Sequence, residues 1–99
     1  MTIAQTILQQ LGGGRFTVMT GAKNYTGHSD ALSFKLPSTN WAKDGINYIK
    51  VILAPSDTYT IEFGKIRGMK YTLLETTEGV YNEDLRRMIA DRTGLALSL

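Results

Sequence analysis

The chain contains no cysteine and only one histidine among its 99 residues. Without cysteine there is neither a disulfide framework nor a thiolate-bound zinc site. Gly12-Gly13-Gly14 follows a predicted helix, whereas a dinucleotide-binding glycine loop follows a strand. The sequence also lacks a phosphate-loop motif and a paired-carboxylate pattern. These absences argue against an enzyme, and we expect a binding protein that uses no cofactor and no metal.

Long apolar runs are missing as well. No stretch approaches the roughly 18 residues that a membrane helix needs. Residues 1–5 lack the basic and apolar regions of a signal peptide. An apolar content of 42% with 20% charged residues is typical of a globular protein, and 99 residues suffice for one core. We expect a single domain over residues 1–99, located in the cytoplasm, with no membrane partner.

Helical patterns occur at both ends of the chain. Thr2 is a predicted N-cap with Gln5 as its capping-box partner, and Gly12 provides the stop of this first helix. Asn82 is the predicted N-cap of a second helix that closes at Gly94. The apolar residues of this second helix follow helical spacing: Tyr81, Leu85, Met88 and Ile89.

Between the helices, alternating apolar and polar residues predict about five strands. They cover Arg15–Thr20, Leu32–Leu36, residues 46–54, Tyr59–Phe63 and Met69–Leu74. Gly21–Asp30 is predicted to be a polar loop, and the strand pattern breaks from Thr76 to Asn82. Short connections favour neighbouring antiparallel strands. The expected fold is therefore α+β, an antiparallel β-meander with the N-terminal and C-terminal helices packed on one face.

Charge is distributed unevenly along the chain. Residues 15–70 contain eight Lys or Arg against four Asp or Glu, a net charge of +4. Residues 75–92 contain three Lys or Arg against five Asp or Glu, a net charge of −2. This polarity could orient an anionic partner, or it could support head-to-tail association into a homo-oligomer.

Basic and aromatic residues gather near the predicted turn between the fourth and fifth strands. Cations on a projecting hairpin could contact phosphates, and a tyrosine beside them could stack on a base. The central strand adds an aromatic-basic face if no helix covers it. The alternative is that charges at a sheet edge only prevent aggregation. The candidate nucleic-acid-binding residues are Lys65, Arg67, Lys70, Tyr71, Lys50 and Tyr48.

A second group of residues suits a protein partner. Trp41 lies in a predicted loop, where it either closes the end of the core or stands exposed as an anchor. Lys23 and Asn24 offer polar contacts in the predicted loop Gly21–Asp30, although a plain surface loop is the simpler explanation for them. His28 is the only evident general base, and no nucleophile or oxyanion cradle accompanies it.

Several short motifs occur together along the chain. Leu11–Phe16 leads to Met19–Asn24, and Gly79–Tyr81 is followed by Glu83–Arg86 and Thr93–Leu95. This combination resembles a family of short uncharacterised proteins encoded by bacteriophages, prophages and other mobile elements. The family has no established activity, so the resemblance implies no site residues. It implies an accessory protein that acts inside a bacterial host cell.

Two functions are consistent with these observations. The first is a non-enzymatic accessory protein that binds DNA or RNA through the basic hairpin and the sheet face. The second is a protein-binding inhibitor or adaptor, or a small virion component, acting on a host or phage protein. Steep salt dependence of binding distinguishes the first from the second.

Overall fold

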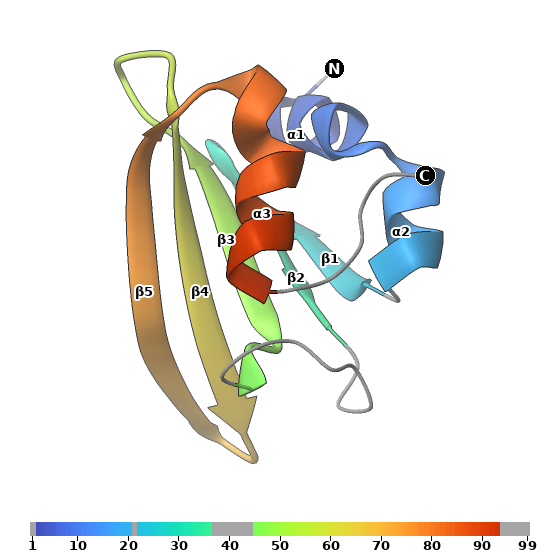
Figure 1. Ribbon diagram of the computed structural model, residues 1–99, viewed down its shortest axis with the longest axis vertical. Helices are drawn as coiled ribbons and strands as arrows, with labels where there is room; N and C mark the ends of the chain where they lie inside the picture. The colour runs from blue at the N-terminus through green and yellow to red at the C-terminus, as the bar shows by residue number, and fades with distance from the viewer. Residues whose placement is uncertain (1, 21, 37–44, 94–99) are drawn as a thin grey trace.

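The computed structural model describes residues 2–20, 22–36 and 45–93. Its five strands form one antiparallel sheet in chain order: β1 (Lys23–Gly27), β2 (Ala31–Lys35), β3 (Tyr48–Leu53), β4 (Tyr59–Arg67) and β5 (Lys70–Val80). The helices are α1 (Ile3–Leu11), α2 (Gly14–Thr20) and α3 (Leu85–Thr93), with the 3-10 turn η2 (Asn82–Asp84) leading into α3. Figure 1 shows α1 and α3 on the same face of the sheet. The predicted α+β meander is thereby confirmed.

The first helix begins and ends where its sequence predicts. The side chain of Thr2 accepts a hydrogen bond from the backbone N–H of Gln5, and the Gln5 side chain accepts one from the Thr2 backbone. Gly12 ends the helix with φ of 118°, a left-handed conformation that glycine adopts at little cost. Ala4, Ile7 and Leu11 are buried against the sheet.

The strand predicted at Arg15–Thr20 is wrong, because this segment is the short helix α2. Phe16 is buried, and its ring meets that of Phe34 edge to face, with centroids 5.3 Å apart. The Thr17 hydroxyl donates to the carbonyl of Gly13, the residue before the helix, and lies 2.7 Å from the Tyr25 hydroxyl. A stretch this short has too few apolar residues for its periodicity to separate a strand from a helix.

The first strand lies instead in the predicted polar loop. In β1 only Tyr25 turns inward, where its ring packs against Phe34, and the other four residues are exposed. An edge strand with a single inward apolar side chain shows no alternation to detect. Its backbone pairing with β2 defines it, through Thr26 opposite Ser33 and Gly27 opposite Leu32.

The last strand is longer than predicted. The strand β5 continues past Leu74 to Val80, with irregularities in its pairing with β4 on either side of the regular stretch from Glu75 to Thr77. Its second half carries few apolar residues, so only the backbone ladder marks it as a strand. The N-cap position of η2 is occupied by Tyr81 and not by Asn82. Tyr81 is also 60% exposed, so it does not belong to the buried apolar side of the second predicted helix.

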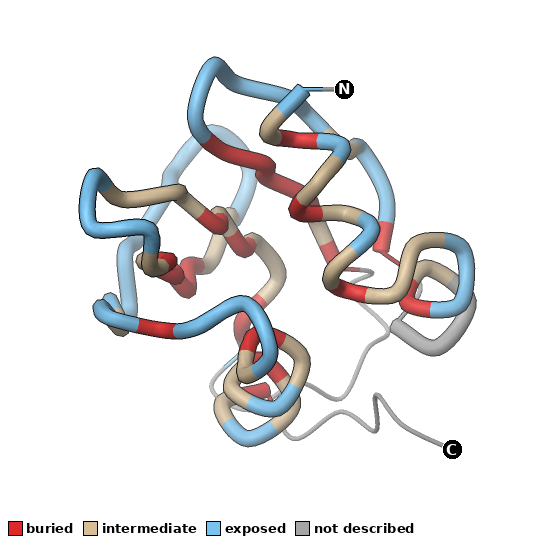
Figure 2. Tube along the Cα trace, turned by 90° about the horizontal axis from the view of Figure 1, so that it is seen from above, coloured by how far each residue is buried: buried red, intermediate tan, exposed pale blue. Residues whose placement is uncertain are grey.

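The core lies between the sheet and the helices, as the buried positions in Figure 2 show. Its largest fully buried side chains come from β2, β3, β4, α1 and α3 and include Phe34, Phe63, Ile49, Ile61, Ile7, Leu11, Leu85 and Ile89. Burying such side chains is the main favourable term in folding. Among the described helices, none combines the length and hydropathy required to cross a membrane.

Candidate nucleic-acid interface

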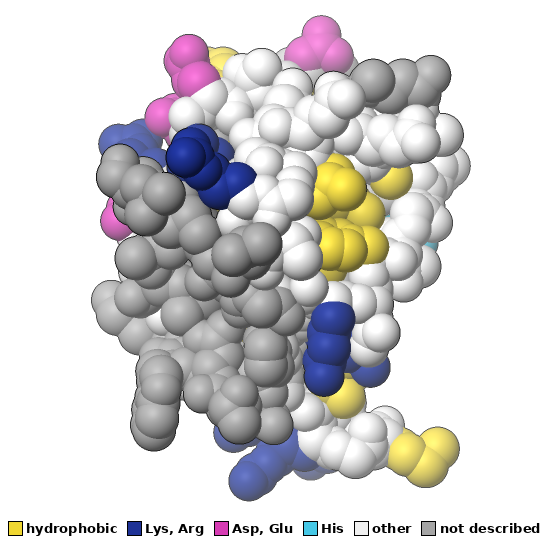
Figure 3. Space-filling view, turned by 90° about the vertical axis from the view of Figure 1, so that its right-hand side faces the viewer, with side chains coloured by type: hydrophobic (Ala, Val, Ile, Leu, Met, Phe, Trp, Pro, Cys, Tyr) yellow, Lys and Arg dark blue, Asp and Glu magenta, His cyan; other side chains and the backbone are white. Residues whose placement is uncertain are grey.

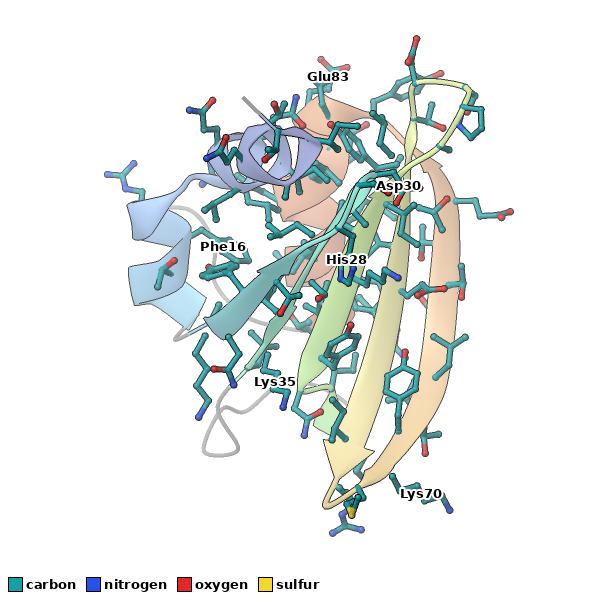
Figure 4. The ribbon with its side chains drawn as sticks, turned by 180° about the vertical axis from the view of Figure 1, so that it is seen from behind. Phe16, His28, Asp30, Lys35, Lys70 and Glu83 are labelled. Carbon is teal, nitrogen blue, oxygen red and sulfur yellow. The ribbon has the colours of Figure 1, made fainter. Side chains whose placement is uncertain are left out.

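The face of the sheet turned away from α1 and α3 is called the open face here. Residues opposite each other on paired antiparallel strands point to the same face. The register places Lys23, Lys35, Tyr48, Gly64 and Leu73 in one row across all five strands. The next row contains Thr26, Ser33, Lys50, Glu62 and Thr76. The open face is therefore basic and aromatic at its centre, and Figure 4 shows the sheet from this side.

Two tyrosines form an aromatic pair on the open face. The rings of Tyr48 and Tyr71 meet edge to face, with centroids 5.4 Å apart and planes at 79°. Tyr71 lies over the backbone of Gly64, where an added Cβ would be 2.7 Å from the Tyr71 hydroxyl and 2.8 Å from its Cζ. Glycine at this strand position therefore allows the ring to approach the sheet.

The tyrosine pair borders a pocket of about 350 Å³. Tyr48, Lys50, Glu62, Ile66 and Tyr71 line it. Burial raises the pKa of the Tyr71 hydroxyl, and the negative charge of Glu62 and the neighbouring Tyr48 raise this pKa further. The hydroxyl is therefore neutral at physiological pH and can donate a hydrogen bond. The pocket offers an aromatic surface, a cation with a carboxylate opposite it, and a hydrogen-bond donor within one recess.

The hairpin cations Lys65, Arg67 and Lys70 lie where β4 ends and β5 begins. They line a second pocket of about 310 Å³ together with Thr72 and Leu74. The ion pairs Arg87–Asp84 and Arg92–Glu75 lie elsewhere, and no ion pair of a hairpin cation with an acid occurs among the described residues. Their positive charges are therefore gathered together and not neutralised by a described acid.

The Asn47 side chain holds the hairpin against the rest of the sheet. Its Nδ2 donates to the carbonyl of Ile66 at 2.9 Å, and its Oδ1 accepts from the Ile66 N–H at 2.7 Å. This side chain thus hydrogen-bonds to β4 as a further strand residue would. The contact gives the hairpin cations a defined position relative to the open face.

The structure divides the six predicted nucleic-acid-binding residues into two groups. The hairpin cations come together on the helix side of the sheet, while Tyr48, Lys50 and Tyr71 come together on the open face. The division arises because successive residues of a strand point to opposite faces. Lys70 and Tyr71 are adjacent in sequence, yet they line different pockets.

Two residues of this region escaped the sequence analysis. Lys35 lies beside Tyr48 on the open face. The alternation of its strand places Lys35 on the polar side, but only the register shows that this side adjoins Tyr48. Gly64 leaves room for the Tyr71 ring to lie against the sheet. Its sequence signal is a glycine inside a strand, which indicates that another group approaches the backbone closely.

The residues predicted to bind a protein partner have different positions. Trp41 lies outside the described residues. Lys23 is exposed in the edge strand β1 and shares its row with Lys35. Asn24 has φ of 57°, and its carbonyl accepts a hydrogen bond from the Thr26 hydroxyl at 3.3 Å. Asn24 therefore belongs to an irregular stretch of β1 and not to a free loop.

His28 contacts Ser33, a buried residue in the second row of the open face. Its Nε2 lies 3.1 Å from the Ser33 hydroxyl, and Ser33 is 3% exposed. Within residues 2–20, 22–36 and 45–93, no carboxylate hydrogen-bonds to His28 and no three His, Cys, Asp or Glu side chains gather as a metal site. The His28–Ser33 contact supports the structure at the connection between β1 and β2.

The charge polarity predicted from the sequence is also a polarity in space. Figure 4 shows Glu83 and Lys70 at opposite ends of the molecule. On the side shown in Figure 3, the acidic side chains lie in the upper part together with some Lys and Arg, whereas the lower end shows Lys and Arg without acidic side chains. Such a separation attracts an anionic partner to the hairpin end.

Comparison of the chain with models of protein families, with curated proteins and with solved structures gives no match. The open face and the hairpin cations are therefore the features from which a function can be inferred.

Proposed function

We propose that this protein binds single-stranded DNA or RNA on the open face of its sheet. The observation that carries the proposal is the Tyr48–Tyr71 pair, which is seated over Gly64 and flanked by Lys35 and Lys50. Single strands bind to surfaces that combine stacking platforms with a positively charged track. The open face has both features.

The tyrosines supply the stacking surface. Tyr71 is 45% exposed, so part of its ring is available to a base. In an edge-to-face pair, one ring presents its edge to the other, and this arrangement leaves ring faces free for a further aromatic group. An unpaired base is such a group, whereas the bases of a duplex are already stacked on each other. The geometry therefore favours a single strand over a duplex.

The cations supply the phosphate contacts. Lys35 and Lys50 are near neighbours of Tyr48 on the open face, and Lys23 extends the row of Lys35 and Tyr48 to the sheet edge. The hairpin cations lie beyond Tyr71 at the end of β4 and β5, where they attract the nucleic-acid backbone over a longer range. A single strand that crosses the open face would thus meet Lys35 and Lys50 beside the tyrosine pair, while the hairpin cations on the helix side of the sheet contribute only long-range attraction.

The experiment that tests this function is fluorescence anisotropy with labelled 12-nucleotide oligothymidylate and oligouridylate. A duplex of the same length serves as the comparison. With three to five phosphate contacts, affinity for a single strand should fall roughly 20- to 100-fold between 50 and 200 mM salt. Binding that hardly changes over this range would contradict the proposal.

Matched variants locate the binding surface. Tyr71→Ala and Tyr48→Ala should each weaken oligonucleotide binding by about 1–3 kcal/mol, because each removes a stacking platform. The triple variant Lys65→Ala/Arg67→Ala/Lys70→Ala should weaken binding and reduce its salt dependence. The control is Arg15→Ala/Arg86→Ala/Arg87→Ala, which removes equal charge from the helices. Equal losses of affinity in the two triple variants would show that binding depends on the net charge of the protein and not on the position of the hairpin cations.

A protein partner is the second candidate function. Exposed apolar side chains near the start of β5 favour it, because clustered apolar exposure marks interaction surfaces. An inhibitor or adaptor of a host or phage protein, or a small virion component, would use such a surface. Its binding should change little with salt, in contrast to that of an oligonucleotide.

The cellular setting follows from the sequence resemblance. We propose that the protein is an accessory factor of a phage or mobile element and works inside a bacterial host cell. In this setting it binds nucleic acid without carrying out a chemical reaction. Nucleic acid that co-purifies with the protein from bacterial cells, and is lost in the Tyr48→Ala/Tyr71→Ala variant, would support this assignment.

A further inference from the structure

Exposed apolar side chains are concentrated at the start of β5. Over the described residues, five large hydrophobic side chains are exposed, and four of them are Met69, Tyr71, Leu73 and Leu74. Among the strands of the described residues, β5 pairs only with β4 and is therefore an edge of the sheet. A long edge strand with apolar side chains is open to pairing with another strand.

The other edge of the sheet differs in each of these respects. The strand β1 has five residues against eleven in β5, and its pairing with β2 is irregular. Its exposed residues are Lys23, Asn24, Thr26 and Gly27. A short, irregular edge that carries a lysine resists strand addition. The contrast singles out β5 as the edge that accepts a partner.

We propose that β5 pairs with β5 of a second copy of this chain, antiparallel and around a twofold axis at Thr72. This goes beyond the proposed function and needs no nucleic acid. A twofold interface uses the same surface on both copies, so the surface must be complementary to itself. The side chains of β5 meet this condition in one register.

The register centred on Thr72 matches apolar side chains in pairs. Between Lys70 and Leu73 the pairing of β5 with β4 is regular, so residues alternate between the two faces. Tyr71 and Leu73 point to the open face, and the register places Tyr71 of one copy opposite Leu73 of the other. On the helix side, the register places the charged Lys70 opposite the apolar Leu74. The cross-strand pair of aromatic Tyr71 with aliphatic Leu73, which occurs twice in the dimer, is of a kind that stabilises a sheet.

Charge determines the relative direction of the two strands. The hairpin end is basic, with Lys70 at the start of β5 and Arg67 opposite it in β4, whereas Glu75 lies further along β5. In the antiparallel register centred on Thr72, Glu75 of one copy lies opposite Met69 of the other, next to Lys70. Parallel pairing would align like charges, which is destabilising.

Disulfide cross-linking tests the register directly, because the chain has no cysteine of its own. Thr72→Cys would place two thiols opposite each other across the twofold axis, where Cα atoms are close enough for a disulfide. The matched control is Thr76→Cys, also exposed on β5, whose two copies would be roughly 26 Å apart along the strands. We expect Thr72→Cys to form a covalent dimer under mild oxidation and Thr76→Cys to stay monomeric.

Cross-linking rates are normalised to the reaction of each thiol with a small reagent, because nearby Lys65 can activate a thiol at position 72. Sedimentation of the unmodified chain, without nucleic acid, should show a dimer that increases with concentration. Leu73→Thr should weaken this association roughly tenfold or more, because the twofold axis creates two Tyr71–Leu73 pairs and the substitution removes both.

A monomer at all concentrations, with no faster cross-linking at position 72 than at 76, would overturn the proposed dimer. Equal cross-linking at both positions would overturn the register. Because these samples contain no nucleic acid, either result would leave the oligonucleotide test of the open face unaffected.

Discussion

The two faces of the sheet carry different kinds of residues on the same strands. In β3, Ile49 and Val51 are fully buried under the helices, while Tyr48 and Lys50 are only partly buried on the open face. One face is apolar and closed by α1 and α3, and the other is aromatic and basic. The comparison teaches that a strand can stabilise the fold with one set of side chains and leave the alternate set free for binding.

The largest expected effect is on the buried face. Phe34 is fully buried and contacts the rings of Phe16 and Tyr25. Phe34→Ala should lower the free energy of unfolding by about 3–5 kcal/mol, because it leaves a cavity at the centre of the core. Urea denaturation followed by circular dichroism measures this loss. Tyr48→Ala on the open face is the matched comparison, and an equal loss there would contradict the division between the faces.

The next effect separates binding from stability on the open face. Gly64→Ala keeps the strand but adds a Cβ where the Tyr71 ring lies, so the half-exposed ring must move away. The free energy of unfolding should change by less than about 1 kcal/mol, because alanine suits a strand better than glycine and offsets the lost ring contact.

Oligonucleotide affinity of Gly64→Ala should nevertheless fall about five- to thirtyfold, as expected for the loss of part of one stacking platform. Anisotropy and urea denaturation on the same sample give both values. Unchanged affinity would show that the position of the Tyr71 ring does not matter for binding.

A smaller effect concerns the contact between α3 and β5. Arg92 Nε lies 2.9 Å from Glu75 Oε1, and both side chains are partly exposed. Glu75→Gln should lower the free energy of unfolding by only about 0.2–1 kcal/mol, and less at 0.5 M salt, because water and ions screen the pair. Thermal denaturation at two salt concentrations checks this, and a loss that persists at high salt would indicate a role other than charge.

The smallest effect appears at alkaline pH. Burial is the main cause that raises the pKa of Tyr25, Tyr59 and Tyr71 above the ordinary value of 10.0. Folding therefore favours the neutral phenol, and this stability is fully present below pH 10 and is lost as the pH rises through the raised values. Tyrosinate absorbance at 295 nm should develop at higher pH in the folded protein than in urea. Coincident titrations would contradict this.

Much of the fold is predictable because strong local signals agree with the tertiary structure. The capping box of Thr2 and Gln5 and the glycine stop at Gly12 define α1. Alternation defines β2, β3 and the first half of β4, which are the strands with one fully apolar side. Short connections then determine the antiparallel order.

The errors occur where local sequence carries little information. Residues 15–20 lie in a helix whose Phe16 packs on Phe34, a contact between segments that are separate in sequence. The strand β1 and the second half of β5 are exposed edge strands, so backbone pairing and not apolar alternation defines them.

The candidate site was predictable as a set of residues but not as an arrangement. The composition near the β4–β5 turn indicates positive charge, and the two pockets contain the predicted cations and tyrosines. Their division between two faces follows from strand alternation around a turn whose position was uncertain from sequence. Lys35 and Tyr48 are neighbours because of the β2–β3 register, which only the folded sheet defines.

The central claim is that the Tyr48–Tyr71 pair on the open face receives a single strand. The most direct measurement is the affinity of the double variant Tyr48→Ala/Tyr71→Ala for 12-nucleotide oligothymidylate at 50 mM salt, beside that of the unmodified chain. We predict measurable binding by the unmodified chain and a loss of at least about tenfold in the variant, with the fold intact by circular dichroism. Equal affinity of the two proteins would contradict the account.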